Sequence, residues 1–172
     1  MAKDNNPGNV FSRLETWLRK HRRRFLASLN PGATPAELDT LQKQVAAPLP
    51  EFLRTLLAWH NGQGQDFVGA FEENWLLMSC QTIAEAKRYL DAEAKDMGWQ
   101  PAWIPFLDND AGDYLCADTS QQQAPVRAFY LGNTEHPAVA ESLERWVEDF
   151  VSNVEKGNYV EEPERGTFMK SS

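Results

Sequence analysis

Apolar residues recur at steps of three and four over residues 10–29, which predicts an amphipathic helix with basic side chains on its other side. The stretch TPAE at residues 34–37 is a capping box with proline at the first helical position, so a second helix should begin there. A third helix is expected over about residues 50–60, with Gly62 as its C-terminal cap.

The hydrophobic pattern changes after the third predicted helix. The short apolar run NWLLMSC, at residues 74–80, is typical of a buried strand. TIAE at 82–85 is a second capping-box sequence and predicts a helix to about residue 97. Three short runs, WIPFLDND, DYLCAD and VRAFYLG, then predict strands separated by turns. We expect a last helix to begin at Pro137 and to end at Gly157.

Predicted helices gather near the N-terminus and predicted strands in the middle of the chain. This order indicates an α+β domain with a single antiparallel-rich sheet packed by helices, not an alternating βαβ fold. We expect one domain over residues 1–157, which includes the added basic helix at about 10–29. Residues 158–172 are expected to form an acidic, flexible tail.

Charge is unevenly distributed over the 172 residues, whose net charge is -8. Six Lys/Arg and one Glu give residues 13–24 a charge of +5, so the remainder carries -13. That acidic remainder argues against a nucleic-acid partner and favours a basic protein partner. The basic run could still mark a nucleic acid or an anionic membrane surface. We favour a solvated helix side that pairs with the acidic body or tail.

The location of the protein can also be inferred from the sequence. The first residues lack the apolar core of a signal peptide, and no apolar run is long enough to span a membrane. Cys80 and Cys116 are too few for a disulfide framework, which fits a reducing compartment. We therefore expect a cytoplasmic protein that neither enters nor spans a membrane.

Acidic residues cluster in LDNDAGDYLCAD, which begins at Leu107. An EF-hand loop that started at Asp108 would place Asp113 where glycine is required, so calcium binding is disfavoured. A catalytic carboxylate pair has no accompanying cleft signature. We interpret the cluster as a turn between two strands that also exposes negative charge. The candidate partner-binding residues in this turn and in the preceding Gly-rich segment are Asp66, Glu72, Glu73, Asp108, Asp110 and Asp113.

No catalytic or metal-binding constellation is evident elsewhere. The three histidines, His21, His60 and His136, stand far apart, and no zinc spacing, nucleophile elbow or phosphate-binding loop occurs. We therefore expect no cofactor and no metal. Aromatic residues around the Gly-rich segment could close the core or form the rim of a partner site, and we favour core closure. These residues are Trp59, Phe67, Phe71 and Trp75.

Two spaced motifs carry a resemblance to a known family. The first comprises Leu49, Pro50, Leu57, Asn61 and Gly62. The second comprises Trp103, Pro105, Asp110 (or Asp108), Gly112 and Asp118. With a short strand ahead of the final helix, this order resembles the SUKH superfamily over about residues 34–151. The fungal members of that superfamily are the Smi/Knr regulators of cell-wall synthesis.

The resemblance implies a sheet packed by helices and no enzyme activity. Many bacterial members are immunity proteins that neutralise a cognate toxin delivered by contact, for example by type VI secretion, whereas fungal members are interaction hubs. Because this chain has no long disordered arms, we favour immunity. A regulatory hub and an enzyme with an acidic site remain the alternatives. The matched positions look structural: Pro50, Asn61, Gly62, Trp103, Pro105, Gly112 and Asp118.

Overall fold

The computed structural model describes residues 7–64, 66 and 68–171. Helices α1 to α6 span Pro7–His21, Arg23–Ser28, Pro35–Gln44, Glu51–Trp59, Cys80–Glu93 and Leu143–Glu155, and a 3₁₀ turn, η1, spans Lys95–Met97. Strands β1 to β7 span Leu76–Leu77, Trp103–Asp108, Tyr114–Asp118, Val126–Phe129, Ala138–Ala140, Tyr159–Glu162 and Thr167–Lys170.

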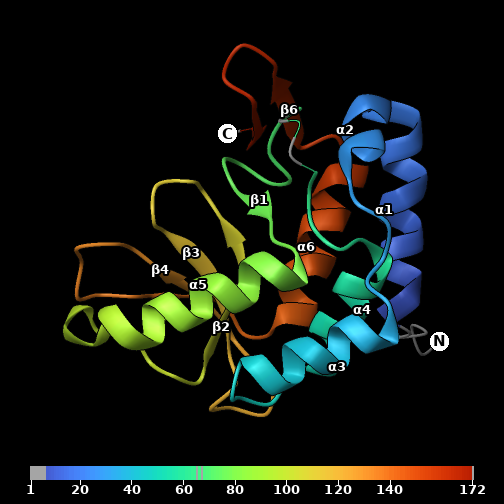
Figure 1. Cartoon of the computed structure of the whole chain (residues 1–172). Helices are drawn as coiled ribbons and strands as arrows, with labels where there is room; N and C mark the ends of the chain where they lie inside the picture. The colour runs from blue at the N-terminus through green and yellow to red at the C-terminus, as the bar shows by residue number, and fades with distance from the viewer. Residues whose placement is uncertain (1–6, 65, 67, 172) are drawn as a thin grey trace.

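Strands β1 to β5 form an antiparallel sheet in which each strand lies beside its neighbours in sequence (Figure 1). The predicted turn between WIPFL and YLCAD joins β2 to β3, with Asp108 opposite Tyr114. The strand expected in NWLLMSC is the short β1. The predicted α+β class with one main antiparallel sheet is confirmed.

Helices cover both faces of this sheet. Neighbouring side chains along a strand point in opposite directions, so each strand can supply apolar side chains to both helical layers. Figure 1 shows α5 crossing in front of the sheet and α6 behind it. One hydrophobic cluster joins α5 to the sheet through Leu90, Ala94, Trp99, Trp103, Cys116 and Phe129. The larger core, on the α6 side, includes Ile104, Phe106, Leu115, Val126, Ala128, Val147 and Phe150.

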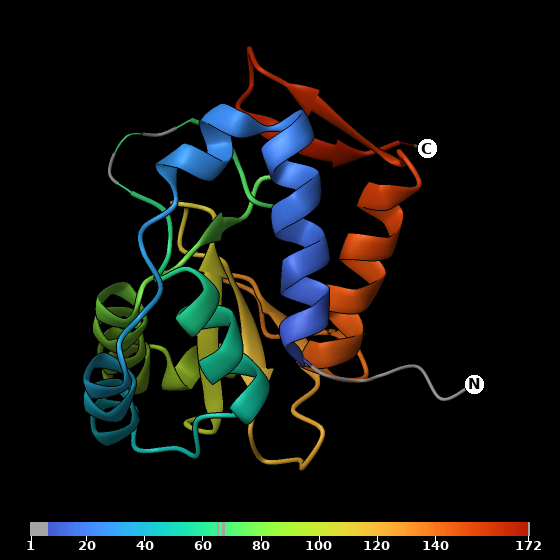
Figure 2. The same ribbon diagram turned by 90° about the vertical axis from the view of Figure 1, so that its right-hand side faces the viewer.

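Helix α1 packs against α6 and α4, and Figure 2 shows α1 and α6 side by side. The ring of Phe11 lies 5.4 Å from that of Trp59. Arg13 donates to Glu148 at 3.0 Å and to Glu155 at 2.6 Å, both on α6. The expected pairing of the basic run with the acidic body is therefore present at Arg13.

The single helix expected over residues 10–29 is interrupted at Arg22, where the backbone adopts φ -134° and ψ 55°. The break separates α1 from α2. The side chain of Arg22 is buried, and its Nε donates to Glu161 in the C-terminal segment. A second basic residue thus pairs with the part of the chain expected to be a tail.

The C-terminal segment differs from the flexible tail that its acidic composition suggests. Residues 159–170 form the hairpin β6–β7, which lies beside α1 and α2 (Figures 1 and 2). Phe168 is 2% exposed, and its ring centroid lies 5.9 Å from that of Trp17 and 4.9 Å from that of Tyr159. Its N–H and C=O pair with the backbone of Glu73 at 2.9 and 2.8 Å. Burial of Phe168 holds the hairpin on the domain.

Two helix starts also differ from prediction. Helix α5 begins after Ser79, whose side chain forms a capping box with Thr82, so TIAE is not the box. Pro137 does not open the last helix, because β5 follows it and α6 begins only after its N-cap, Ser142. The expected end is correct: Gly157, at φ +76°, stands just after α6 and its N–H bonds the carbonyl of Val154.

Candidate functional site

The two acidic segments that were far apart in the sequence meet at one end of the main sheet. Residues 71–75 lead into β1, and residues 109–113 join β2 to β3. Because Leu76 of β1 pairs with Asp108 of β2, the two turns lie side by side. They border a pocket of about 350 Å³. Its lining is Glu72, Glu73, Asn74, Trp75, Asn109, Asp113, Leu115, Ala128, Tyr130, Val139 and Trp146. We call it the acidic pocket.

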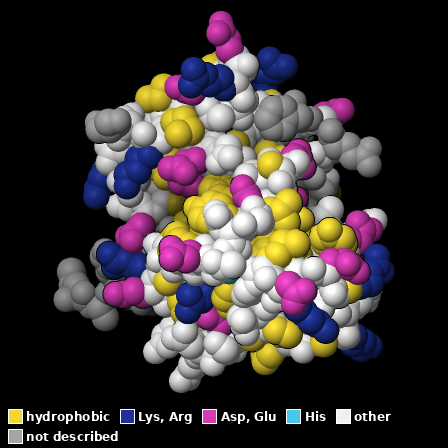
Figure 3. Space-filling model, turned by 90° about the vertical axis from the view of Figure 1, so that its left-hand side faces the viewer, with side chains coloured by type: hydrophobic (Ala, Val, Ile, Leu, Met, Phe, Trp, Pro, Cys, Tyr) yellow, Lys and Arg dark blue, Asp and Glu magenta, His cyan; other side chains and the backbone are white. Residues whose placement is uncertain are grey.

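Aromatic and aliphatic side chains form the walls of the acidic pocket. Trp75 is buried, Tyr130 and Trp146 are half-buried, and Val139 is 47% exposed. Trp146 also packs edge-on against Phe106, at 5.6 Å between ring centroids. In the face shown in Figure 3, hydrophobic side chains gather near the middle with acidic ones among and around them. Aromatic anchors within a charged rim are typical of protein interfaces.

The 109–113 turn is held by its own polar side chains, as its composition predicts. Asn109 Oδ1 accepts from the backbone N–H of Ala111 at 3.0 Å and of Asp113 at 3.2 Å. The Asp113 carboxylate accepts from Asn109 Nδ2 and from the N–H of Leu131, both at 2.9 Å. Asp113 therefore fixes the turn, while Asp110, at φ +57°, stands exposed at its tip.

The structure separates the predicted contact acids into exposed and buried ones. Glu73 and Asp113 are half-buried in the lining of the pocket, and Asp110 is exposed beside it. Asp66 is exposed but does not line the pocket. These positions leave Glu73, Asp110 and Asp113 as the acids that can present charge there.

Glu72 and Asp108 are less available for contact than the sequence suggested. Glu72 is only 8% exposed and accepts from the hydroxyl of Tyr159 at 2.6 Å. Burial raises the pKa of Glu72 to about 7, and the charge of Glu73 adds to this effect. Asp108 is half-buried outside the pocket lining, and burial followed by the nearby charge of Asp110 raises its pKa to about 6. At neutral pH Glu72 is partly protonated as well as buried, whereas Asp108 is mostly ionised but only half-exposed, so neither is a freely exposed contact acid.

Aromatic residues of the Gly-rich segment mainly close the core, as favoured from the sequence. Phe71 and Trp75 are 1% and 7% exposed, and the ring of Phe71 lies 5.1 Å from that of Phe150. Phe67 lies outside the described residues. Trp75 has both roles, because it also lines the acidic pocket.

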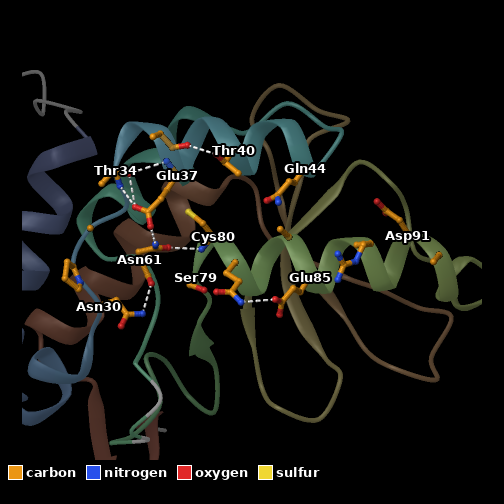
Figure 4. A pocket seen from close by; sticks show the side chains of 17 residues that line it. Asn30, Thr34, Glu37, Thr40, Gln44, Asn61, Ser79, Cys80, Glu85 and Asp91 are labelled. Atoms are coloured by element: carbon orange, nitrogen blue, oxygen red, sulfur yellow. Dashed lines mark hydrogen bonds between the residues drawn. The ribbon is translucent and has the colours of Figure 1, made fainter.

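A larger groove, of about 1250 Å³, runs between α3 and α5 (Figure 4) and was not foreseen from the sequence. Several of its polar groups bond each other. Glu37 accepts from the N–H and hydroxyl of Thr34, and these bonds lower the pKa of the Glu37 carboxyl. The Asn61 side chain spans the groove: Nδ2 donates to Glu37 at 3.5 Å, and Oδ1 accepts from the N–H of Cys80 at 2.7 Å. This network joins the starts of two helices.

The first matched motif has a structural role at that groove. Pro50 precedes the first residue of α4, and Asn61 satisfies an N-terminal amide of α5. Gly62 is not the cap of α4, because that helix ends at Trp59 and its C-cap, His60, is extended. Instead Gly62, at φ +79°, lies against the backbone of residues 78–79 where a Cβ would come within 2.5 Å of the Ser79 nitrogen.

The second matched motif supports the sheet. Trp103 is buried against α5, and Pro105 lies next to a β-bulge, where a strand tolerates proline. Gly112 adopts φ +90°, and a Cβ there would lie 2.7 Å from Leu131 Cδ2. Asp118 is buried and accepts from Arg127 Nε at 2.8 Å. These contacts all join parts of the same fold, and they stabilise the sheet and its turns.

The histidines, cysteines and other side chains that could act in catalysis or bind a metal are dispersed or already hydrogen-bonded. His60 contacts the carbonyl of Asn30 and the carboxylate of Glu15, and His136 contacts the carbonyl of Met97. Both cysteines are free and buried. Within residues 7–64, 66 and 68–171, no three His, Cys, Asp or Glu side chains converge in a way that could hold a metal ion. No helix in the described part of the chain is both long and apolar enough to cross a membrane.

Comparison with known proteins agrees with the geometry. The model of the SMI1 / KNR4 family (SUKH-1) matches residues 32–149. No curated protein matches the chain. The family match covers α3 to β5 and about half of α6, and leaves α1, α2 and the C-terminal hairpin outside it. The chain is a member of the SMI1/KNR4 (SUKH-1) family.

Proposed function

We propose that this chain is a non-enzymatic immunity protein that binds and neutralises one cognate protein toxin by covering its active site. The observation that carries the proposal is the acidic pocket, where two acidic turns from different parts of the sequence meet around aromatic walls. Membership of a superfamily that includes immunity proteins supports it. Placement in the cytoplasm is part of the proposal, and the two free, buried cysteines fit a reducing compartment.

The negative charge around the acidic pocket explains why it would bind a toxin with a basic active-site cleft. Toxins that act on nucleic acids or nucleotides hold their substrates in basic clefts, and an acidic surface is complementary to such a cleft. Glu73, Asp110 and Asp113 would supply the charge, and Tyr130 and Trp146 the apolar contact area. Complementary charge of this kind accelerates association and makes binding weaken with salt.

The test is a pull-down with the tagged, full-length protein from native lysate at low and moderate salt, read by mass spectrometry. We expect one stoichiometric partner that carries a toxin domain. The variant Glu73→Gln/Asp110→Asn removes two charges without changing side-chain size, and asparagine tolerates the positive φ of residue 110. We expect partner affinity to fall about tenfold and its salt dependence to become shallower.

A matched control is Glu93→Gln/Glu164→Gln, which removes two exposed charges outside the pocket lining. It should leave affinity unchanged. Equal affinities for the wild type and the pocket variant would refute the acidic pocket as the contact surface. A set of several moderate-affinity partners would instead support the regulatory hub, the other function known in this superfamily.

A further inference from the structure

A separate hollow of about 440 Å³ lies where the α1–α2 break meets the C-terminal hairpin. The helical side contributes His21, Arg22, Arg23 and Arg24, and the hairpin contributes Glu161 and Thr167. This hollow therefore contains half of the basic run, in a protein whose net charge is -8. Of the described residues that line it, none belongs to the acidic pocket or to the groove between α3 and α5.

Arg22 is the buried charge of this hollow, at 4% exposure. Its guanidinium carbon lies 4.1 Å from the ring centroid of Phe25 and 4.2 Å from that of Phe168. Nε donates to Glu161 and Nη2 to the carbonyl of Ala70, both at 3.0 Å. Among the described residues, Nη1 has no hydrogen-bond partner. A buried donor with no acceptor is uncommon in folded proteins, because its lost hydration is not replaced.

Positive charge exceeds negative charge around Arg22. Glu161 is the one acidic side chain in the described lining, against three arginines. Arg23 and Arg24 are exposed in the lining of the hollow, and among the described residues neither is paired with a carboxylate; Arg23 Nε donates to the carbonyl of Arg19. The unpaired Nη1 donor of Arg22 and the unpaired charges of Arg23 and Arg24 would both be satisfied by the same kind of ligand. That ligand is anionic and accepts several hydrogen bonds.

We propose that this hollow binds the phosphate group of a small phosphate monoester. Arginine guanidinium groups suit phosphate oxygens, to which they donate charge-assisted hydrogen bonds. Nη1 is itself shielded from solvent, so a phosphate oxygen would reach it only after a small shift of the Arg22 side chain; the phosphate charge would balance Arg23 and Arg24. The volume lies within the range of small-molecule pockets and exceeds what a lone phosphate fills, so the ester carries a further group such as a sugar.

The test is isothermal titration of the intact protein with ribose 5-phosphate, with inorganic phosphate and acetate as comparison ligands at matched ionic strength. We expect saturable binding of ribose 5-phosphate, weaker binding of inorganic phosphate, and acetate binding at least about tenfold weaker. Arg23→Gln/Arg24→Gln leaves the buried Arg22 in place and should weaken ribose 5-phosphate binding at least about tenfold.

The control is Arg88→Gln/Arg145→Gln, which removes two exposed arginines from α5 and α6 and should leave binding unchanged. If circular dichroism shows that Arg23→Gln/Arg24→Gln does not fold, Arg24→Gln alone replaces it in the comparison with the control. The proposal is overturned if ribose 5-phosphate does not bind saturably, if acetate binds equally well, or if the control weakens binding as much as the Arg23/Arg24 variant.

Discussion

Replacement of Gly62 by alanine tests whether the first matched motif acts through the fold. Gly62 and Gly132 have nearly the same positive φ, +79° and +80°. Alanine in this left-handed region costs about 1–2 kcal/mol at either position. No atom lies within 4 Å of a Cβ added at Gly132, so that conformational term is the whole effect expected there.

At Gly62, alanine would also cost steric energy in addition to this conformational cost. A Cβ there would lie 2.5 Å from the nitrogen of Ser79 and 2.8 Å from the carbonyl carbon of Met78, and backbone atoms can yield only if the start of α5 moves. Such overpacking costs about 1–3 kcal/mol. Movement of α5 would also weaken the Asn61–Cys80 hydrogen bond, worth about 1 kcal/mol. We expect Gly62→Ala to lose about 2–4 kcal/mol more than Gly132→Ala.

Equilibrium urea unfolding, followed by tryptophan fluorescence, measures the difference. Both variants should keep the wild-type dependence on urea, so the shift in midpoint reports the change in free energy of unfolding. A difference below about 1 kcal/mol between the variants would refute the reasoning, because the contact at Ser79 would then carry no energetic weight. Loss of partner binding by a stable Gly62→Ala protein would point instead to a direct functional role.

Three further measurements probe other parts of the structure. Phe168→Ala should lower the free energy of unfolding by about 3–5 kcal/mol because it removes a buried ring. Met169→Ala, at a side chain 37% exposed, should change it by less than about 1 kcal/mol; equal effects in urea unfolding would contradict the packed hairpin. Burial raises the pKa of Glu72 from 4.5 to about 7, so the fold favours the protonated carboxyl, a contribution complete below pH 4.5 and lost as pH rises through 7. Glu72→Gln should reduce that loss by up to roughly 3 kcal/mol, and unchanged pH dependence between pH 5 and 8 would argue against it. Arg13→Met should cost about 0.5–1 kcal/mol at low salt and less at high salt, because Arg13 and its partners are partly exposed; a cost insensitive to salt would show that packing, not charge, matters there.

Local chemistry made much of the fold predictable. The capping box at residues 34–37 and the turn at 109–113 both form as their sequences indicate, because their hydrogen bonds join residues only a few positions apart. The start of α5 was misplaced because Ser79/Thr82 and Thr82/Glu85 have the same spacing. A local pattern of this kind cannot distinguish two overlapping registers; the tertiary contact from Asn61 to Cys80 favours the earlier one.

Features that depend on distant residues were not predictable in the same way. The burial of Glu72 depends on Tyr159, which follows it by 87 residues. The acidic composition of the C-terminal segment is typical of a solvated tail. Its packing depends in part on the inward-pointing Arg22, whose bond to Glu161 the sequence does not indicate. The sequence could suggest which turns are acidic, but only the pairing of β1 with β2 shows that they share one pocket.

The contact between Arg22 and Glu161 also bears on how the protein is made. These residues are 139 positions apart, so α1 leaves the ribosome long before the hairpin that covers it. At about 5–20 residues per second, translation of that interval takes roughly 7–28 s. During this time Leu14, Leu18 and Phe25, all buried in the finished fold, have no native partners from α6 or the hairpin. The nascent chain therefore presents an apolar, basic segment to which a chaperone can bind until α6 and the hairpin have been made.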